Sequence, residues 1–208
     1  MEIIQARQVP GFTSIYQHQR YAEVAKLLPK NAKFLEIGVL FGRSTWAWLD
    51  VLPDDTTYDV LDSFNVDASE IPDFVRSDRM PKFGKNLDIW SNIVNMLKNM
   101  SHKEVWNFVM EHHPKYKLLS NVTSMSTHQY IYKKYCSTYD AIYLDSEHTY
   151  EHTKKVLEYF KDTKVICGDD YKNKDWPELE IAVKEFAKNY NFKLTEYPEN
   201  LFFILEKQ

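Results

Sequence analysis

Short apolar runs alternate with amphipathic segments along most of the chain, and this alternation constrains the fold more than any other feature. The apolar runs have the length of strands, and the segments between them show helical spacing. We predict strands at 33–38, 57–62, 116–120, 139–145 and 164–170. We predict helices at 13–28, 43–52, 87–100, 103–113, 127–136, 147–160 and 176–190, and a hairpin over 191–207. This order is typical of a doubly wound α/β fold, in which helices cover both faces of a mostly parallel sheet.

The composition fits one soluble globular domain that spans residues 1–208. The chain contains 44% hydrophobic residues and has a net charge of −4, which provides no basic surface for nucleic acid. No apolar run approaches the roughly 20 residues of a membrane span, and the first residues lack the features of a signal peptide. We therefore expect a soluble, cytoplasmic protein that binds neither nucleic acid nor a membrane, with free thiols at Cys136 and Cys167.

Two segments go beyond the plain alternation of strands and helices. The N-terminal helical segment, 1–30, is interpreted as a lid on the domain. The region 65–115 is too long for a simple crossover, so we expect it to select the substrate. Its aromatic residues include Phe74, Phe83, Trp90, Trp106 and Phe108. One or two of these rings are expected to line an acceptor pocket, and the others to pack in the core.

The segment "FLEIGVLFGRST" (34–45) joins the first predicted strand to a helix through Gly38 and Gly42. Such a turn lets backbone N–H groups and a helix N-terminus approach a ligand closely. The dinucleotide fingerprint Gly-x-Gly-x-x-Gly is not met, because position 40 is Leu. The alternative is a tight turn that binds nothing.

The second predicted strand ends in Asp62, which follows Gly38 by 24 residues. A carboxylate at this place can accept hydrogen bonds from both hydroxyls of a ribose, as in other Rossmann-like folds. The alternative is that Asp62 only stabilises the turn that follows it.

Three acids follow the fourth and fifth predicted strands: Asp145, Asp169 and Asp170. Neighbouring strands lie about 5 Å apart, so these carboxylates can converge at one edge of the sheet. They would repel one another unless a cation neutralised them. An all-oxygen set favours Mg²⁺ or another hard cation such as Mn²⁺. The alternative is a group of solvated acids, with Asp145 or Glu147 capping the next helix.

A rival pattern occupies the same segment. "HTYEH" (148–152) matches His-x-x-Glu-His, the inverted zinc-protease motif. That site needs both histidines on an established helix, whereas His148 directly follows a strand. We therefore expect His152 to be an exposed helix residue.

Several of these motifs together resemble class I S-adenosylmethionine-dependent methyltransferases. Glu-x-Gly-x-x-x-Gly (36–42) is similar to their motif I, and "DSF" (62–64) and "LDSEHTYE…CGDDY" resemble the metal-dependent sugar O-methyltransferases related to the macrocin enzyme. The resemblance covers about Phe34 to Gln208. It implies a Rossmann-like sheet of seven strands in the order 3-2-1-4-5-7-6, ending in an antiparallel hairpin.

The resemblance also implies roles for individual residues. S-adenosylmethionine, which leaves as S-adenosylhomocysteine, would bind at Glu36, Gly38, Gly42, Ser44, Asp62, Ser63, Asn121 and Asp145. Asp145, Asp169 and Asp170 would bind Mg²⁺ or Mn²⁺. His148 or Glu147 would be the general base, and we favour His148 because a neutral imidazole accepts a proton at neutral pH. Two departures are the missing Pro-Gly-Gly before the fifth strand and the missing acid after the third, where Asn121 could bind the adenine amino group.

The function that follows is Mg²⁺-dependent O-methylation of a sugar or glycan hydroxyl. A catechol-type small-molecule O-methyltransferase is the nearest alternative. A different metal-dependent enzyme, such as a hydrolase or a hydroxylase-associated protein, and a non-catalytic cofactor-binding module are the others. Related proteins often form dimers, so a homodimer is an expectation as well.

Overall fold

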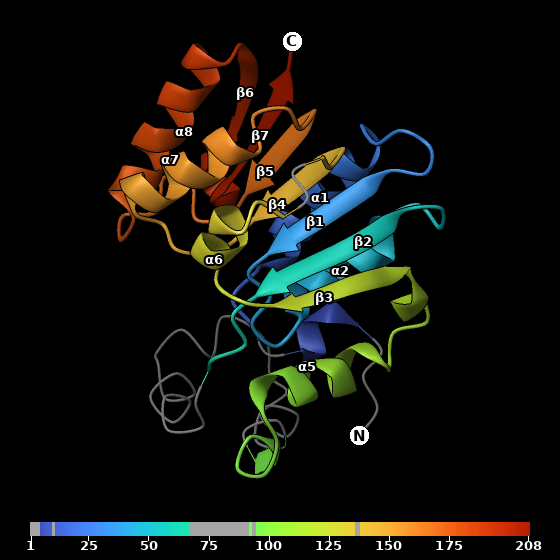
Figure 1. The fold of residues 1–208 in the computed structure, drawn as a ribbon. Helices are drawn as coiled ribbons and strands as arrows, with labels where there is room; N and C mark the ends of the chain where they lie inside the picture. The colour runs from blue at the N-terminus through green and yellow to red at the C-terminus, as the bar shows by residue number, and fades with distance from the viewer. Residues whose placement is uncertain (1–4, 10, 67–91, 93–94, 136–137) are drawn as a thin grey trace.

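The computed structural model describes residues 5–9, 11–66, 92, 95–135 and 138–208. Its centre is a seven-stranded sheet in the order β3-β2-β1-β4-β5-β7-β6 (Figure 1). The strands are β1 (Lys33–Ile37), β2 (Thr57–Asp62), β3 (Leu119–Ser124), β4 (Ala141–Leu144), β5 (Val165–Gly168), β6 (Phe192–Tyr197) and β7 (Phe202–Lys207). Strands β1 to β5 pair in parallel, and β7 pairs antiparallel with β5 and β6. The Rossmann-like, doubly wound sheet with a terminal hairpin is thus confirmed.

Helices cover both faces of this sheet. They are α1 (Ile15–Ala25), α2 (Arg43–Val51), α5 (His102–Met110), α6 (Thr127–Tyr132), α7 (Tyr150–Tyr159) and α8 (Pro177–Asn189), with 3₁₀ turns η1 (Ala6–Gln8), η3 (Tyr116–Leu118) and η4 (Pro198–Asn200). Hydroxyl side chains cap four of them, because each accepts a backbone N–H that the first turn leaves unpaired. These caps are Ser14, Ser101, Ser126 and Thr149.

Alternation along the central strands divides the core into two layers. Successive side chains of a strand point to opposite faces, so Phe34 and Tyr143 pack in the layer with α1, α2 and α5. Leu35 and Ile142 pack in the other layer, with α7 and α8. Figure 1 shows α7 and α8 together on one face and α2 on the opposite face. Both faces of the central strands are buried, which is why these strands are continuous apolar runs in the sequence.

The third strand differs from its prediction. The predicted segment 116–120 is a 3₁₀ turn followed by the start of β3, which runs over Leu119–Ser124. This strand lies at the edge of the sheet, and its side chains are half-buried or exposed. Its polar residues therefore resemble a loop, although Asn121 and Thr123 align with Asp59 and Leu61 of β2.

Several helices are shorter than predicted, and two of them, α6 and α7, follow β3 and β4. Helix α6 ends at Tyr132 rather than at position 136, and the chain turns at Lys134, whose φ is 52°. Helix α7 begins at Tyr150 rather than at 147, because the Thr149 hydroxyl accepts the backbone N–H of His152 and caps it. Residues 145–149 consequently form a loop at the end of β4.

The N-terminal segment packs closely on the sheet layer beneath it. The Tyr21 ring in α1 stacks on Trp48 in α2 with ring centroids 4.0 Å apart, and its hydroxyl donates to the Tyr143 hydroxyl at 2.9 Å. Helix α1 is thus anchored in the core, and its role as a lid stays a prediction.

Part of the predicted substrate region lies outside the described residues, including Phe74, Phe83, Trp90 and half of the predicted helix 87–100. Within the described part, Trp106 is buried in the core and Phe108 is half-buried. Cys167 is a buried free thiol, whereas Cys136 lies outside the described residues.

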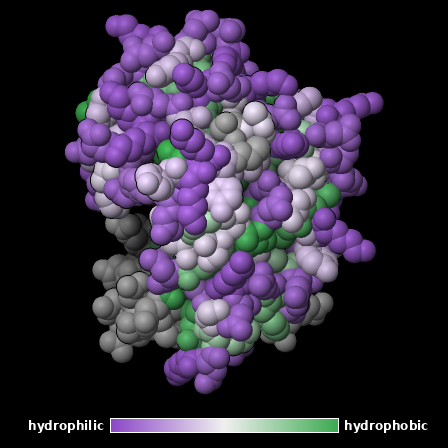
Figure 2. Space-filling view, viewed as in Figure 1, coloured by the Kyte–Doolittle hydropathy of each residue, from purple (hydrophilic) through white to green (hydrophobic). Residues whose placement is uncertain are grey.

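The surface over α7 and α8 is mostly hydrophilic (Figure 2). Across the described part of the chain, no helix combines the length and the apolar character that crossing a membrane requires.

Candidate functional site

A cavity of about 850 Å³ opens at the carboxyl ends of the parallel strands. Gly38 follows β1, Asp62 ends β2, Asp145 follows β4, and Asp169 and Asp170 follow β5; all of them line the cavity. In open α/β sheets, ligands bind at this edge. Residues 11–14 and two side chains of α1 also line the cavity, so segments far apart in sequence meet at one site.

Asp145, His148 and Asp170 form a compact group, here called the acidic cluster. One ligand atom from each lies within 4.8 Å of the others. The His148 Nε2 atom is 3.0 Å from Asp170 Oδ2 and 4.0 Å from Asp145 Oδ1. The imidazole of His148 is mostly buried, and each carboxylate is about a quarter exposed. Two oxygen ligands and one nitrogen ligand therefore face one point in the cavity.

Asp169, the third aspartate of the predicted set, lines the same cavity but is not part of this group, and its role as a metal ligand stays a prediction. Its buried Oδ1 accepts hydrogen bonds from the Gln17 side chain and from the Asp170 backbone N–H. The Asp170 backbone lies in the left-handed region, with φ of 55°. The acidic cluster therefore joins two of the predicted metal ligands to His148, the predicted base.

The electrostatics of the acidic cluster favour a neutralising charge. Burial, and then repulsion from Asp170, raise the pKa of Asp145 to about 7. Burial and the charge of Asp145 also raise the pKa of Asp169 well above its ordinary value. Burial opposes protonation of His148, but its hydrogen bond with Asp170 and the charges of both acids raise its pKa. Without a cation, these shifts favour the protonated forms of Asp145 and His148.

Gly38 and Gly42 are required by contacts within the protein. Both lie in the left-handed region, with φ of 87° and 94°. A Cβ atom on Gly38 would lie 1.7 Å from the backbone oxygen of Asp145, and one on Gly42 would lie 2.5 Å from Met110 Cε. The first glycine thus lets the β1 turn and the β4 loop touch, while Gly42 packs against α5 and does not line the cavity.

Asp62 organises the turn after β2 and still faces the cavity. Its carboxylate accepts the backbone N–H groups of Val39 at 2.7 Å and Phe64 at 2.6 Å. An ionised carboxylate offers about four acceptor positions, so two remain for a ligand. Ser63 also lines the cavity and donates to Asn65, and the buried Ser44 lines it from the start of α2.

Glu36 and Asn121, two of the predicted cofactor ligands, lie outside the cavity lining. Glu36 is fully buried under the turn, where Thr45 donates at 2.7 Å and Tyr58 at 2.5 Å. Burial raises the pKa of Glu36 to about 7. Asn121 is exposed on the edge strand and donates to Asp59 at 2.8 Å. Both side chains have partners within the protein, and their part in cofactor binding stays a prediction.

His152 is buried, with 4% of its surface exposed, and the expectation of an exposed helix residue is wrong. Its Nε2 lies 3.1 Å from Ser146 Oγ, and its Nδ1 lies 3.6 Å from Glu147 Oε2. Burial lowers the pKa of His152. Because α7 begins only at Tyr150, His148 lies in the loop and faces the acidic cluster instead. The two histidines of the inverted zinc-protease motif therefore have different partners: His148 lies against Asp170, and His152 lies against Glu147.

Three cavity residues gave no clear signal in the sequence. Gln17 belongs to the capping box of α1 and reaches Asp169. His128 follows β3 at the start of α6. Trp176 precedes α8, is 42% exposed, and places its ring 5.4 Å from that of His148, measured between centroids. Only the Ser-x-x-Gln capping pattern could have drawn attention to one of them.

Solved structures of O-methyltransferases share this fold. The O-methyltransferase NovP is 19% identical with a TM-score of 0.60, covering 96% of this chain and 83% of that chain. CalS11, a TDP-rhamnose 3'-O-methyltransferase of calicheamicin biosynthesis, is 17% identical with a TM-score of 0.55, covering 92% and 77%. An O-methyltransferase from Bacillus cereus in complex with SAH is 14% identical with a TM-score of 0.51, covering 97% and 86%. No model of a known protein family matches the chain, and no curated protein matches it in sequence.

Proposed function

We propose that this chain is an O-methyltransferase that moves a methyl group from S-adenosylmethionine to a hydroxyl of a sugar or glycan, with Mg²⁺ or Mn²⁺ at the acidic cluster. The observation that carries the proposal is the convergence of Asp145, His148 and Asp170 in the cavity that Gly38 and Asp62 also line. The fold shared with O-methyltransferases, one of them in complex with SAH, supports it.

The Gly38 and Asp62 side of the cavity fits the cofactor. Ligand cavities commonly measure about 300–1,000 Å³, and this one, at about 850 Å³, is large enough for a nucleoside and an acceptor together. Asp62 keeps acceptor capacity for ribose hydroxyls beyond its two backbone bonds. The sugar acceptor named for CalS11 also agrees with this choice of substrate class.

The acidic cluster fits a hard divalent cation. Its two carboxylates are the ligand type that Mg²⁺ and Mn²⁺ prefer, and burial together with the charge of Asp170 raises the pKa of Asp145, which a cation would counteract. When bound, such a cation supplies positive charge that lowers the pKa of an acceptor hydroxyl. Asp145 and Asp170 would hold it.

The remaining steps belong to the side chains of this chain. His148 lies at the cluster and is placed to accept the proton that the acceptor hydroxyl loses. A cation held by Asp145 and Asp170 would offset the charges that raise the pKa of His148, and the neutral imidazole would then be able to accept the proton. Glu147 points to His152 rather than to this cluster, which favours His148 over Glu147.

Exposed aromatic side chains at the cavity support a sugar as the acceptor. Phe12, Tyr16 and Trp176 are 41%, 60% and 42% exposed, and all three line the cavity. Exposed rings gathered at a cavity mark a binding surface, and the apolar faces of sugars stack on such rings. A catechol would use the same cluster, so the acceptor has to be tested directly.

The test is a methyl-transfer screen with labelled S-adenosylmethionine against nucleotide sugars, glycans and catechols, with Mg²⁺ or with EDTA. We expect transfer to a sugar in Mg²⁺, and loss of at least about 100-fold in EDTA and in Asp170→Asn. Transfer only to catechols would move the assignment to the alternative. Binding of S-adenosylhomocysteine without any transfer would indicate a non-catalytic module, and the absence of cofactor binding would refute the proposal.

A further inference from the structure

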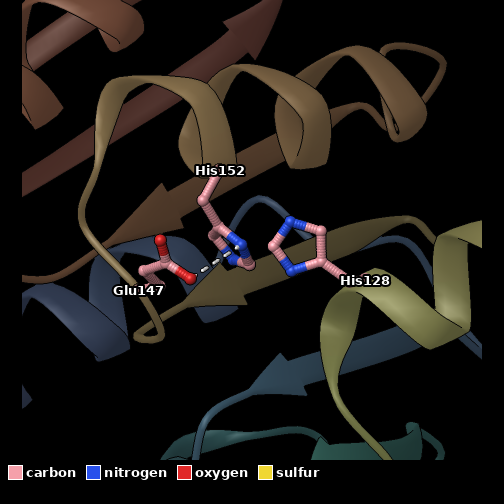
Figure 3. A group of neighbouring side chains, drawn as sticks. All are labelled: His128, Glu147 and His152. Atoms are coloured by element: carbon pink, nitrogen blue, oxygen red, sulfur yellow. Dashed lines mark ion pairs between the residues drawn. The ribbon is translucent and has the colours of Figure 1, made fainter.

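A second group of ligating side chains lies at the same cavity, formed by His128, Glu147 and His152 (Figure 3). They come from the start of α6, the loop after β4 and the first turn of α7. One ligand atom from each lies within 4.8 Å of the others. The rings of His128 and His152 lie edge to face, with centroids 4.8 Å apart. We call this group the histidine cluster.

The buried member of the histidine cluster has an unused nitrogen. His152 is 4% exposed, and its Nδ1 has no hydrogen-bond partner among the described residues. Its Nε2 is 3.1 Å from Ser146 Oγ. If Nε2 carries the proton and donates to Ser146, Nδ1 keeps a lone pair, which is directed toward Glu147 Oε2 at 3.6 Å. Two electron-pair donors then face each other, an arrangement that a cation between them would stabilise.

We propose that His128, Glu147 and His152 bind one divalent transition-metal ion of the zinc type. Two imidazoles and a carboxylate are a ligand set suited to Zn²⁺, Co²⁺ and Ni²⁺, whereas the acidic cluster has more oxygen ligands and suits Mg²⁺. A hydrogen bond donated by Nε2 to the Ser146 hydroxyl would fix the tautomer of His152, because a metal-binding imidazole commonly donates a hydrogen bond from its other nitrogen. Three protein ligands leave a fourth position, which water or a molecule in the cavity would fill.

The exposure of the ligands allows them to close on the ion. Zinc–nitrogen bonds measure about 2.0–2.1 Å, so the ligand atoms of a tetrahedral site lie about 3.4 Å apart. Here the ligand atoms of the three residues lie within 4.8 Å of one another. His128 and Glu147 are exposed and can move inward by about 1 Å, whereas the buried His152 stays fixed. Glu147 also accepts a hydrogen bond from Thr149 at 2.8 Å, which orients its carboxylate.

The test measures Co²⁺ binding to untagged, metal-stripped protein by calorimetry and by visible absorption. Excess Mg²⁺ is present so that the harder ion occupies the acidic cluster. We expect one Co²⁺ per chain with an absorption band typical of imidazole ligands. His128→Ala and Glu147→Gln change exposed side chains, so folding is not at risk, and each should weaken the apparent Kd at least about tenfold.

Two matched variants distinguish the histidine cluster from a surface histidine and from the acidic cluster. His112→Ala removes a histidine that does not line the cavity, and Asp170→Asn alters only the acidic cluster; both should bind Co²⁺ as the wild type does. Wild-type protein that binds no Co²⁺, or a His128→Ala variant with unchanged affinity, would overturn the proposal. So would an Asp170→Asn variant that loses Co²⁺ as strongly as His128→Ala. The readout requires no methyl transfer, so it is independent of the proposed function.

Discussion

Asp145 connects the Gly38 turn to the acidic cluster, because its main chain contacts the turn and its side chain belongs to the cluster. Its backbone N–H donates to the Ile37 carbonyl at 2.8 Å, and its carbonyl lies where Gly38 lacks a Cβ. The carboxylate then faces His148 and Asp170. The turn that would hold the cofactor and the loop that would hold the cation are therefore positioned by the same residue.

At this scale, the first prediction concerns Asp170. Saturating Mg²⁺, at about 100 times its Kd, should stabilise wild-type protein by about 2.7 kcal/mol, which raises the Tm of a chain of this size by about 5–10 °C. Asp170→Asn removes one charged ligand and should lose most of this rise. Thermal unfolding with and without Mg²⁺ measures it, and an equal rise in the variant would contradict the cation site.

The second prediction concerns Trp176, which lines the cavity with its ring near that of His148. Trp176→Ala should raise the KM for the sugar acceptor by about five- to tenfold, because a stacking contact of about 1–1.5 kcal/mol is lost. The Kd of S-adenosylhomocysteine should not change. Tyr132→Ala is the matched control, because Tyr132 is 87% exposed and does not line the cavity. An unchanged KM for Trp176→Ala would remove the ring from the acceptor site.

At the scale of elements, the site depends on where strands stop and helices begin. The loop between β4 and α7 exists because Thr149 caps the helix, and it directs His148 and Glu147 to different clusters. The Gly38 turn allows this loop to approach β1.

Gly38→Ala tests this approach. The added Cβ would overlap the Asp145 carbonyl at 1.7 Å, and φ of 87° is unfavourable for alanine. We expect the free energy of unfolding to fall by at least about 2 kcal/mol, together with weaker binding of S-adenosylhomocysteine. Urea unfolding measures the first effect. A variant with the wild-type urea midpoint would show that the contact between turn and loop is not needed.

The elements explain how far the sequence could predict the protein. Strands buried on both faces, such as β1, β4 and β5, are continuous apolar runs and were predicted, as was the hairpin. The edge strand β3 has polar residues, and only its pairing with β2 identifies it. The sequence identifies the residues at the strand ends but not their partners. Asp169 accepts a hydrogen bond from Gln17, which lies 152 positions away, and no local pattern predicts that contact. The burial of His152 likewise depends on packing between α6 and α7.

At the scale of the whole molecule, folding brings the carboxylates of Asp145 and Asp170 together in the cavity, and their negative charges repel each other. Asp145 has a pKa of about 7 in the fold, against an ordinary value of about 4. The stability linked to its protonated form is complete below about pH 4 and is lost as the pH rises through about 7. Metal-free protein therefore carries an electrostatic cost at about pH 8 that it largely lacks at about pH 5.

This cost gives the pH prediction. In EDTA, Asp145→Asn should raise the Tm relative to wild type more at about pH 8 than at about pH 5, because asparagine cannot ionise. Added Mg²⁺ at the higher pH should raise the Tm of wild type and have little effect on the variant. Scanning calorimetry at both pH values measures this difference. A difference between variant and wild type that does not change with pH would contradict the assignment of the charge to Asp145.

The central claim is that Asp145 and Asp170 hold a divalent cation in the cavity that also receives the cofactor. The most direct measurement is an anomalous difference map from crystals grown with Mn²⁺ and S-adenosylhomocysteine. The account predicts one strong peak about 2.0–2.4 Å from carboxylate oxygens of both aspartates, with the nucleoside beside Asp62. A map without a peak there, with His148 still paired to Asp170, would contradict it.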